Sequence, residues 1–259
     1  MINNRGGVGK TDLVLRLAEA LAKRGRKVGI VDLDPQGNLS RRAGWTYNEE
    51  DPQVTVSEAI KANRVGTMAE VWTPVQWDVE YASRMRLAPA WLELDERYAE
   101  AGVVGSHLRL AKALHGADED LDDLLIDCPP SLFHLTQMGM AAADGVLVVS
   151  RAEMDSVLGA KRVRNFIAEK RSELHADDLE IVGVVVNDYE QGKPRQRQQL
   201  ESIRRTFGDR VWEPVIPRRE IIANAANDHL ALEQGKGSQL SQAVGGFELL
   251  ADTYEKRIA

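Results

Sequence analysis

The sequence has a single cysteine, Cys128, so it can form neither an internal disulfide nor a metal site built from several cysteines of one chain. No apolar run approaches the roughly 20 residues of a membrane-spanning helix. The N-terminus lacks the basic start and the long apolar stretch of a signal peptide, so we expect a cytoplasmic protein. Basic residues are fewer than acidic ones, with 33 Lys and Arg against 40 Asp and Glu, so the formal net charge is −7. This balance excludes nucleic-acid binding by bulk charge, but it leaves room for a local basic patch.

Short apolar segments alternate with helical ones along the 259 residues. Strands are expected at residues 27–33, 124–127, 145–150 and 180–187, with a weaker one at 211–216 that contains Pro214. Helices are expected at residues 13–23, 156–174 and 195–207. This alternation predicts an α/β fold with a mostly parallel sheet and helices on both faces. Residues 46–110 are less regular, and we expect them to be an insertion within a single domain of residues 1–259.

Residues 4–11 read NRGGVGKT and stand directly before the first expected helix. Glycines let backbone N–H groups turn toward an anion, and the N-terminus of the helix adds its positive end. Lys10 can reach the β- and γ-phosphates of a nucleotide, and the Thr11 hydroxyl can hold Mg²⁺. The standard phosphate loop begins with glycine where this chain has Asn4. A glycine-rich turn can also be no more than a tight connection.

Two further polar segments follow expected strands. Residues 32–40 read DLDPQGNLS, and residues 125–131 read LIDCPPS. Ligands of open parallel sheets bind outside the carboxyl ends of the strands, so these segments and the loop should meet in one crevice. Asp127 stands where phosphate-loop enzymes place a carboxylate on the Mg²⁺ side. Each aspartate alone could simply cap a helix or turn, but three such segments in this order favour a nucleotide site.

Together, GGVGKT, DLDPQGN and IDCPPS resemble the ParA/Soj/MinD family of deviant Walker-type ATPases, which have a P-loop NTPase fold. The order and spacing match from Asn3 to the end of the chain. The segments LAPAWLEL (residues 87–94) and VIPR (residues 215–218) resemble the ParA/Soj branch.

The resemblance implies a Mg-ATP site and a dimer that encloses two nucleotides. It implies that Lys10, Asp34 and Arg5 act in catalysis, with Asp34 positioning the attacking water. It places Mg²⁺ beside Thr11, Asp32 and Asp127. The implied nucleotide-binding residues are Gly6, Gly7, Val8, Gly9, Lys10, Thr11, Asp12, Asn187 and Pro217, the last two beside the adenine. For Asn187 and Pro217, a strand terminator and a turn proline are equally good interpretations.

Three features depart from the family pattern. The family's signature lysine, which contacts phosphate across the dimer, is replaced by Arg5, and the two residue types are not interchangeable. A hydroxyl residue that contacts the α-phosphate is replaced by Asp12, which we expect to point away or to weaken nucleotide binding. Only Met1 and Ile2 precede the loop, where the family has a full buried strand. We therefore expect the true start to lie upstream.

Charge is unevenly distributed along the chain. Residues 48–123 carry sixteen acidic and seven basic side chains, whereas residues 187–219 carry eight basic and five acidic ones. Basic side chains that neutralise phosphates bind DNA without sequence preference, although a basic segment is also often just a solvated helix face. The family binds DNA through this region. We expect contacts from Lys193, Arg195, Arg197, Arg218 and Arg219.

These expectations describe a nucleoid-associated partition ATPase. ATP would drive homodimer formation and non-specific DNA binding, and a ParB-like partner would stimulate a slow hydrolysis that releases DNA. Two alternatives are a MinD-like ATPase that positions another cargo and a hydrolysis-impaired scaffold. Residues 247–259 lack the basic excess of a membrane-surface helix, so we expect no membrane partner.

Overall fold

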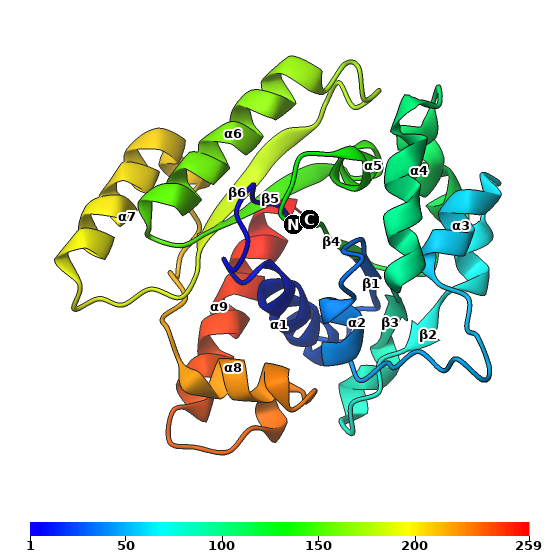
Figure 1. Ribbon diagram of the computed structural model, residues 1–259. Helices are drawn as coiled ribbons and strands as arrows, with labels where there is room; N and C mark the ends of the chain where they lie inside the picture. The colour runs from blue at the N-terminus through cyan, green and yellow to red at the C-terminus, as the bar shows by residue number, and fades with distance from the viewer. Residues whose placement is uncertain (259) are drawn as a thin grey trace.

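Parallel strands form the centre of the molecule in the computed structural model, which describes residues 1–258 (Figure 1). One sheet has the order β2–β3–β1–β4, with bounds Thr73–Pro74, Met85–Ala88, Val28–Asp32 and Asp123–Asp127. β5 (Gly145–Ser150) pairs with β6 (Glu180–Val186) in a second sheet. All pairings are parallel except that of β2 with β3. The predicted parallel α/β fold is therefore confirmed.

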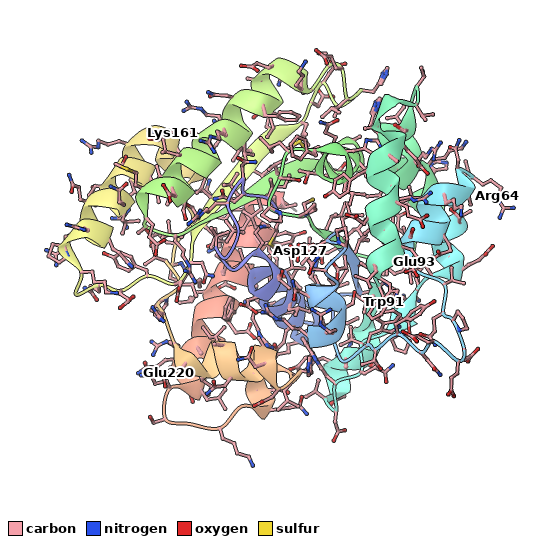
Figure 2. The ribbon with its side chains drawn as sticks, viewed as in Figure 1. Arg64, Trp91, Glu93, Asp127, Lys161 and Glu220 are labelled. Carbon is pink, nitrogen blue, oxygen red and sulfur yellow. The ribbon has the colours of Figure 1, made fainter. Side chains whose placement is uncertain are left out.

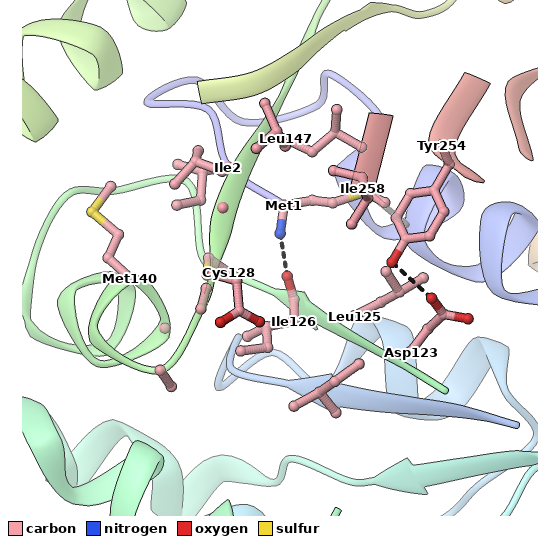
Figure 3. Close-up of a pocket in the computed structure, with 18 of the residues that line it drawn as sticks. Met1, Ile2, Asp123, Leu125, Ile126, Cys128, Met140, Leu147, Tyr254 and Ile258 are labelled. Atoms are coloured by element: carbon pink, nitrogen blue, oxygen red, sulfur yellow. Dashed lines mark hydrogen bonds between the residues drawn. The ribbon is translucent and has the colours of Figure 1, made fainter. Parts of the chain in front are cut away.

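Met1 and Ile2 lie between the two sheets and connect them. The Ile2 N–H donates to the Leu147 carbonyl of β5 at 3.0 Å, and the Cys128 N–H after β4 donates to the Met1 carbonyl at 3.3 Å. The Met1 amine donates to the Ile126 carbonyl, as Figure 3 shows. Beside Met1, a cavity of about 450 Å³ extends between the neighbouring strands, with Tyr254 at its wall (Figure 3). The two residues thus occupy a strand position at the centre of the fold.

Helices cover both faces of the strands and form two cores. Apolar side chains of α1, α8 and α9 pack on one face together with Val28 and Ile30, whereas those of α3 to α7 pack on the other with Val31. This alternation is the two-residue period expected of strands buried on both faces. The α-helices are α1 (Lys10–Lys23), α2 (Asn38–Arg42), α3 (Val56–Ala62), α4 (Arg109–Leu114), α5 (His134–Ala141), α6 (Met154–Lys170), α7 (Pro194–Phe207), α8 (Glu220–Asn227) and α9 (Leu240–Ile258).

Short 3₁₀ turns connect many of these elements. They are η1 (Thr67–Glu70), η2 (Glu80–Arg84), η3 (Leu92–Gly102), η4 (Ser106–Leu108), η5 (Gly208–Arg210) and η6 (Leu232–Gln234). In the described part of the chain, no helix is both long enough and apolar enough to cross a membrane.

Two of the expected elements differ from the structure. Residues 211–216 do not form a strand, since they contribute only an isolated bridge between Val211 and Val184. Pro214 has no N–H to donate to a ladder, which accounts for the difference. Residues 46–110, which we expect to be an insertion, contain α3, β2 and β3, and β3 pairs with β1 in the main sheet.

The helix α1 carries a buried ion pair. Arg16 Nη1 donates to Glu19 Oε2 at 2.8 Å, and the two side chains are 1% and 6% exposed. Glu19 also accepts hydrogen bonds from the Tyr81 hydroxyl at 2.7 Å and from the Leu232 N–H at 3.0 Å. These bonds attach α1 to η6, in the segment that follows α8.

Candidate functional site

A cavity of about 590 Å³ opens at the carboxyl edge of the strands. It lies where β1, β4 and β6 end, which is the usual ligand position in an open parallel sheet. The segments that follow these strands contribute Asp34, Pro130 and Asn187 to its wall. The lining also includes Gly6, Gly7, Gly9, Lys10, Thr11, Asp12, Arg42, Arg151, Asp188, Pro217, Arg218 and Arg219. The three polar segments therefore meet, as the sequence predicts.

The loop before α1 has a conformation that requires glycine. Gly7 and Gly9 have φ values of +72° and +86°, which side chains rarely adopt. A Cβ on Gly9 would lie 2.1 Å from Asn187 Nδ2, which donates to the Val8 carbonyl at 3.1 Å. The close approach of Asn187 thus fixes the loop. The loop and the first N–H groups of α1 form a cradle of the kind that binds phosphate.

Asp127 and Thr11 meet at the base of this cradle. The Thr11 hydroxyl donates to Asp127 Oδ2 at 2.6 Å, while the buried Oδ1 has no hydrogen-bond partner. Burial raises the pKa of Asp127, and the nearby Lys10 ammonium and the Thr11 hydrogen bond oppose this shift. A buried carboxylate oxygen without a partner is a position that a cation can satisfy. Figure 2 shows Asp127 at the centre of the molecule, near the start of α1.

Asp32 and Asp34 differ in burial and in their hydrogen-bond partners. Asp32 is fully buried, and its Oδ2 accepts from the Ser40 N–H at 2.9 Å and from the Ser40 hydroxyl at 2.7 Å. Burial and the neighbouring Asp127 raise the pKa of Asp32 to about 7. Asp34 instead lines the cavity and accepts from the Gln36 N–H at 3.0 Å. Only Asp34 of the two is placed to meet a bound molecule directly.

The donor set fits a magnesium ion that is shared with a phosphate. Among residues 1–258, no three His, Cys, Asp or Glu side chains come together as a metal site. Mg²⁺ keeps waters and commonly binds through one or two carboxylates plus substrate phosphates. Thr11 and the unpartnered Asp127 oxygen suit such a site, and Asp32 lies behind them with its carboxylate engaged by Ser40.

Asp12 does not point away from the cavity, in contrast to one of the two outcomes expected from the sequence. It lines the cavity in the first turn of α1. Arg42 Nη1 at the end of α2 donates to Asp12 Oδ1 at 2.7 Å. Burial raises the pKa of Asp12, and the Arg42 guanidinium acts against this rise.

A second group of charges lies on the far wall of the cavity. Arg151 Nη2 lies 2.6 Å from Asp188 Oδ2, and Arg218 lies 3.3 Å from Glu190. Arg219 is half-buried, and its Nε has no hydrogen-bond partner in the described chain. Arg218 and Arg219, which the sequence predicts to contact DNA, also line the cavity. Glu190, the partner of Arg218, also pairs with Lys193, which directly precedes α7.

Arg5 and Val8, like Asp32 and Asp127, are not among the residues that line the cavity. Arg5 is exposed and lies 3.6 Å from Asp155 at the start of α6. The Val8 side chain is 1% exposed and belongs to the core, so only the backbone of Val8 faces the cradle. A local motif gives the order of the residues but not the direction of each side chain. The exposed Arg5 is compatible with the expected contact to the nucleotide of a second chain.

Several Lys and Arg side chains gather on two adjacent helices, α6 and α7. These helices lie side by side, opposite α3 and α4 (Figure 1). Lys193, just before α7, is paired with Glu190 at 2.7 Å. Six cations have no carboxylate within ion-pair distance among the described residues; we call them the α6–α7 cations: Lys161, Arg162, Arg164, Arg195, Arg197 and Arg205.

Four of these six lie outside the set that was predicted to bind DNA. Lys161, Arg162 and Arg164 are on α6, outside the basic segment of residues 187–219. Figure 2 shows Lys161 on α6, where the side chain faces α7. Their basic cluster KRVR was visible in the sequence, but its proximity to α7 depends on tertiary packing.

Comparison with known proteins identifies relatives along most of the chain. The model of an AAA domain, AAA_31, matches residues 1–181. The chromosome-partitioning ATPase Soj of Thermus thermophilus is 34% identical over 226 residues, which span 87% of this chain and 82% of Soj. An uncharacterized protein of Mycobacterium tuberculosis is 32% identical over 84% of this chain, and the match spans 66% of that protein.

A solved structure shares the fold of this chain. It is a cobyrinic acid a,c-diamide synthase of Mycobacterium smegmatis with a bound ATP analog and magnesium. The structure matches with a TM-score of 0.79 and 27% identity over 98% of this chain and 92% of the synthase.

Proposed function

Because this chain belongs to the ParA/Soj family of P-loop ATPases, we propose that it is a partition ATPase that couples Mg-ATP binding and hydrolysis to reversible DNA binding. One observation carries the proposal. The glycine-rich loop, Lys10, Thr11 and Asp34 line one cavity at the edge of a parallel sheet, and Asp127 lies beside it, where its carboxylate accepts a hydrogen bond from Thr11. This is the arrangement that phosphoryl transfer from a nucleotide requires.

The proposal gives the main residues of the site the following roles. The loop N–H groups and Lys10 bind and neutralise phosphate oxygens, and Thr11 and Asp127 hold Mg²⁺, which supplies charge neutralisation when bound. Asp34 orients the attacking water at the cavity wall. Asn187 holds the loop through the Val8 carbonyl, and Asn187 and Pro217 border the position of the base. The chemistry needs positioning and electrostatic stabilisation more than covalent catalysis.

Dimerisation is the second part of the proposal. Arg5 is 54% exposed and faces away from the cavity of its own chain. A guanidinium in this place is suited to the nucleotide of a second copy, where it would act as an arginine finger acts. Phe133, Met154 and Leu158 are also exposed, and they follow β4 or lie on α6, near the loop. We infer that a second chain covers this side when ATP is bound.

DNA binding is assigned to the α6–α7 cations and Lys193. Their charge is not neutralised within the described chain, apart from that of Lys193, and contacts to phosphates require no particular base sequence. A dimer carries twice as many of these cations as a single chain. Because ATP drives dimer formation, DNA binding then depends on ATP. A ParB-like partner would stimulate hydrolysis and so release the DNA.

The proposal is tested by DNA retention with and without nucleotide. Wild-type protein with ATP and Mg²⁺ should bind non-specific duplex DNA, whereas Lys10→Ala should lose both ATP binding and this retention. Lys61→Ala, an exposed lysine on α3, is the matched control and should behave like the wild type. Retention that is equal with and without ATP, or unchanged in Lys10→Ala, would refute the coupling. ATP binding without hydrolysis would favour the scaffold alternative, and ATP-dependent binding to anionic liposomes would favour a MinD-like role.

A further inference from the structure

Asp12 places a carboxylate in the wall of the proposed phosphate cradle. It is the third residue of α1, directly after Lys10 and Thr11, and it lines the same cavity as both. A carboxylate near bound phosphates repels them. A cavity that binds phosphates therefore needs a cation close to Asp12 that offsets the charge of its carboxylate.

Arg42 supplies a cation at this position. Its Nη1 lies 2.7 Å from Asp12 Oδ1, and the two side chains are 27% and 24% exposed. The residue ends α2, the helix that begins after Asp34, and its own carbonyl accepts a hydrogen bond from Trp77 Nε1 at 3.0 Å. Arg42 is thus held on the cavity wall by the segment that also carries Asp34.

The other arginines near Asp12 are committed elsewhere. Arg16 is bonded to Glu19 at 2.8 Å and to the Leu230 carbonyl at 3.0 Å. Arg151 is paired with Asp188 at 2.6 Å. Within residues 1–258, Arg42 is the one cation that lies within ion-pair distance of Asp12.

We propose that Arg42 is an affinity-determining residue of the nucleotide site, and that it acts by neutralising Asp12 so that the cradle accepts phosphates. This inference rests on the proposed function, since it requires that the cavity binds a nucleotide. Arg42 does not replace Lys10; it offsets the one acidic side chain in the first turn of the loop helix. The pair is an interaction between α1 and α2, thirty residues apart in the chain.

A double-mutant cycle distinguishes this role from a direct contact between Arg42 and phosphate. The four proteins are wild type, Arg42→Gln, Asp12→Ser and the double variant, and the measurement is the Kd of a fluorescent ATP analogue with Mg²⁺. In the wild-type background, Arg42→Gln should raise the Kd about tenfold. In the Asp12→Ser background, the same substitution should raise the Kd less than about threefold. Arg42→Lys, which keeps the charge, should restore most of the affinity.

Two controls test whether a change in Kd comes from a loss of folding stability or from the loss of one positive charge anywhere on α2. Arg41→Gln removes the same charge from the neighbouring position of α2, where Arg41 bonds to the Gln36 carbonyl and to Asn38 rather than to Asp12. Its Kd should stay within about twofold of the wild type. The unfolding temperature of every variant, measured without nucleotide, should match the wild type within about 2 °C.

The possible failures are distinguishable. If wild type binds the analogue but Arg42→Gln weakens binding equally in both backgrounds, Arg42 contacts phosphate directly and this inference is wrong, while the proposed function stands. An unchanged Kd in Arg42→Gln would also overturn the inference alone. If wild type binds no ATP analogue, the proposed function fails and the inference fails with it.

Discussion

At the scale of single residues, the ion pair of Arg16 and Glu19 shows how charge can be tolerated inside α1. Glu19 receives hydrogen bonds from Arg16, from the Tyr81 hydroxyl and from backbone N–H groups of η6. A buried charge is stable only when it is paired and hydrogen-bonded in this way. The same bonds attach α1 to the segment after α8, and α8 itself contributes Glu220, Ile222 and Ala223 to the cavity wall.

Removal of Glu19 should therefore destabilise the whole protein. Glu19→Ala leaves the Arg16 guanidinium buried without its counter-charge, which should lower the free energy of unfolding by about 3–5 kcal/mol. Urea unfolding followed by tryptophan fluorescence measures this change. The exposed Glu50→Ala is the matched control and should change the free energy by less than about 0.5 kcal/mol. A loss below about 1 kcal/mol in Glu19→Ala would contradict the importance of this pair.

Gly9 provides a second prediction at this scale. Gly9→Ala combines an unfavourable φ of +86° with a Cβ that would lie 2.1 Å from Asn187 Nδ2. We expect it to weaken binding of the ATP analogue more than tenfold, because the cradle must move to relieve the contact. Gly7→Ala has a similar φ of +72° but no atom within 4 Å of the added Cβ, so its effect should be clearly smaller. Equal effects would show that backbone strain alone decides the loop geometry.

At the scale of elements, a histidine cluster connects η4, α5 and the segment after α6. The rings of His107 and His175 stack with centroids 5.7 Å apart and planes within 3°. Burial lowers the pKa of His107, and His175 adds to the effect. Burial also lowers the pKa of His134, with contributions from His107 and Arg109, while Glu100 opposes them.

These shifts predict that acid destabilises the packing of η4 against α5. Both folded-state pKa values lie below the ordinary value of 6.5, so the unfolded chain binds more protons below about pH 6.5. The contribution of the histidines is present above pH 6.5 and is lost as the pH falls through the lowered values. Urea midpoints between pH 7.5 and 5.5 should decline less in His107→Gln than in wild type. The exposed His229→Gln should leave the slope unchanged, and an equal slope in all three proteins would contradict the prediction.

At the scale of the whole molecule, the distribution of charge matters more than its sum. The net charge is −7, yet the α6–α7 cations lie on one side of the protein. Arg64 and Glu93 lie on the opposite side, near α3 (Figure 2). The α6–α7 cations therefore mark the side that the proposed DNA would approach. The segment that contains α3 and α4, residues 48–123, carries sixteen acidic and seven basic side chains.

This distribution predicts how salt affects DNA binding. Arg195→Gln/Arg197→Gln should reduce the slope of log K against log salt by about 1–2, since each phosphate contact contributes about 0.9. Lys61→Gln/Arg64→Gln removes the same charge from exposed positions on the side of α3 and should leave the slope unchanged. ATP binding should be equal in all three proteins. Equal slopes in both variants would assign the effect to net charge rather than to α7.

The sequence by itself determined the strands β1, β4, β5 and β6, the helices α1, α6 and α7, and the position of the phosphate loop. Each of these follows from a local pattern: a short β-branched run, an apolar stripe with helical spacing, or a glycine-rich turn before a helix. The convergence of Lys10, Thr11 and Asp34 on one cavity, with Asp127 bonded to Thr11 beside it, was also predictable, because parallel strands bring their carboxyl ends to one edge.

Only the tertiary structure decided which distant segments meet. It placed β3 beside β1, turned Arg5 outward and Val8 inward, and moved Arg218 and Arg219 to the cavity wall. It also paired Asp12 with Arg42. Such contacts depend on the packing of elements far apart in the chain. A hydrophobic period specifies which face of an element is buried, but not which charged side chain of another element lies opposite it.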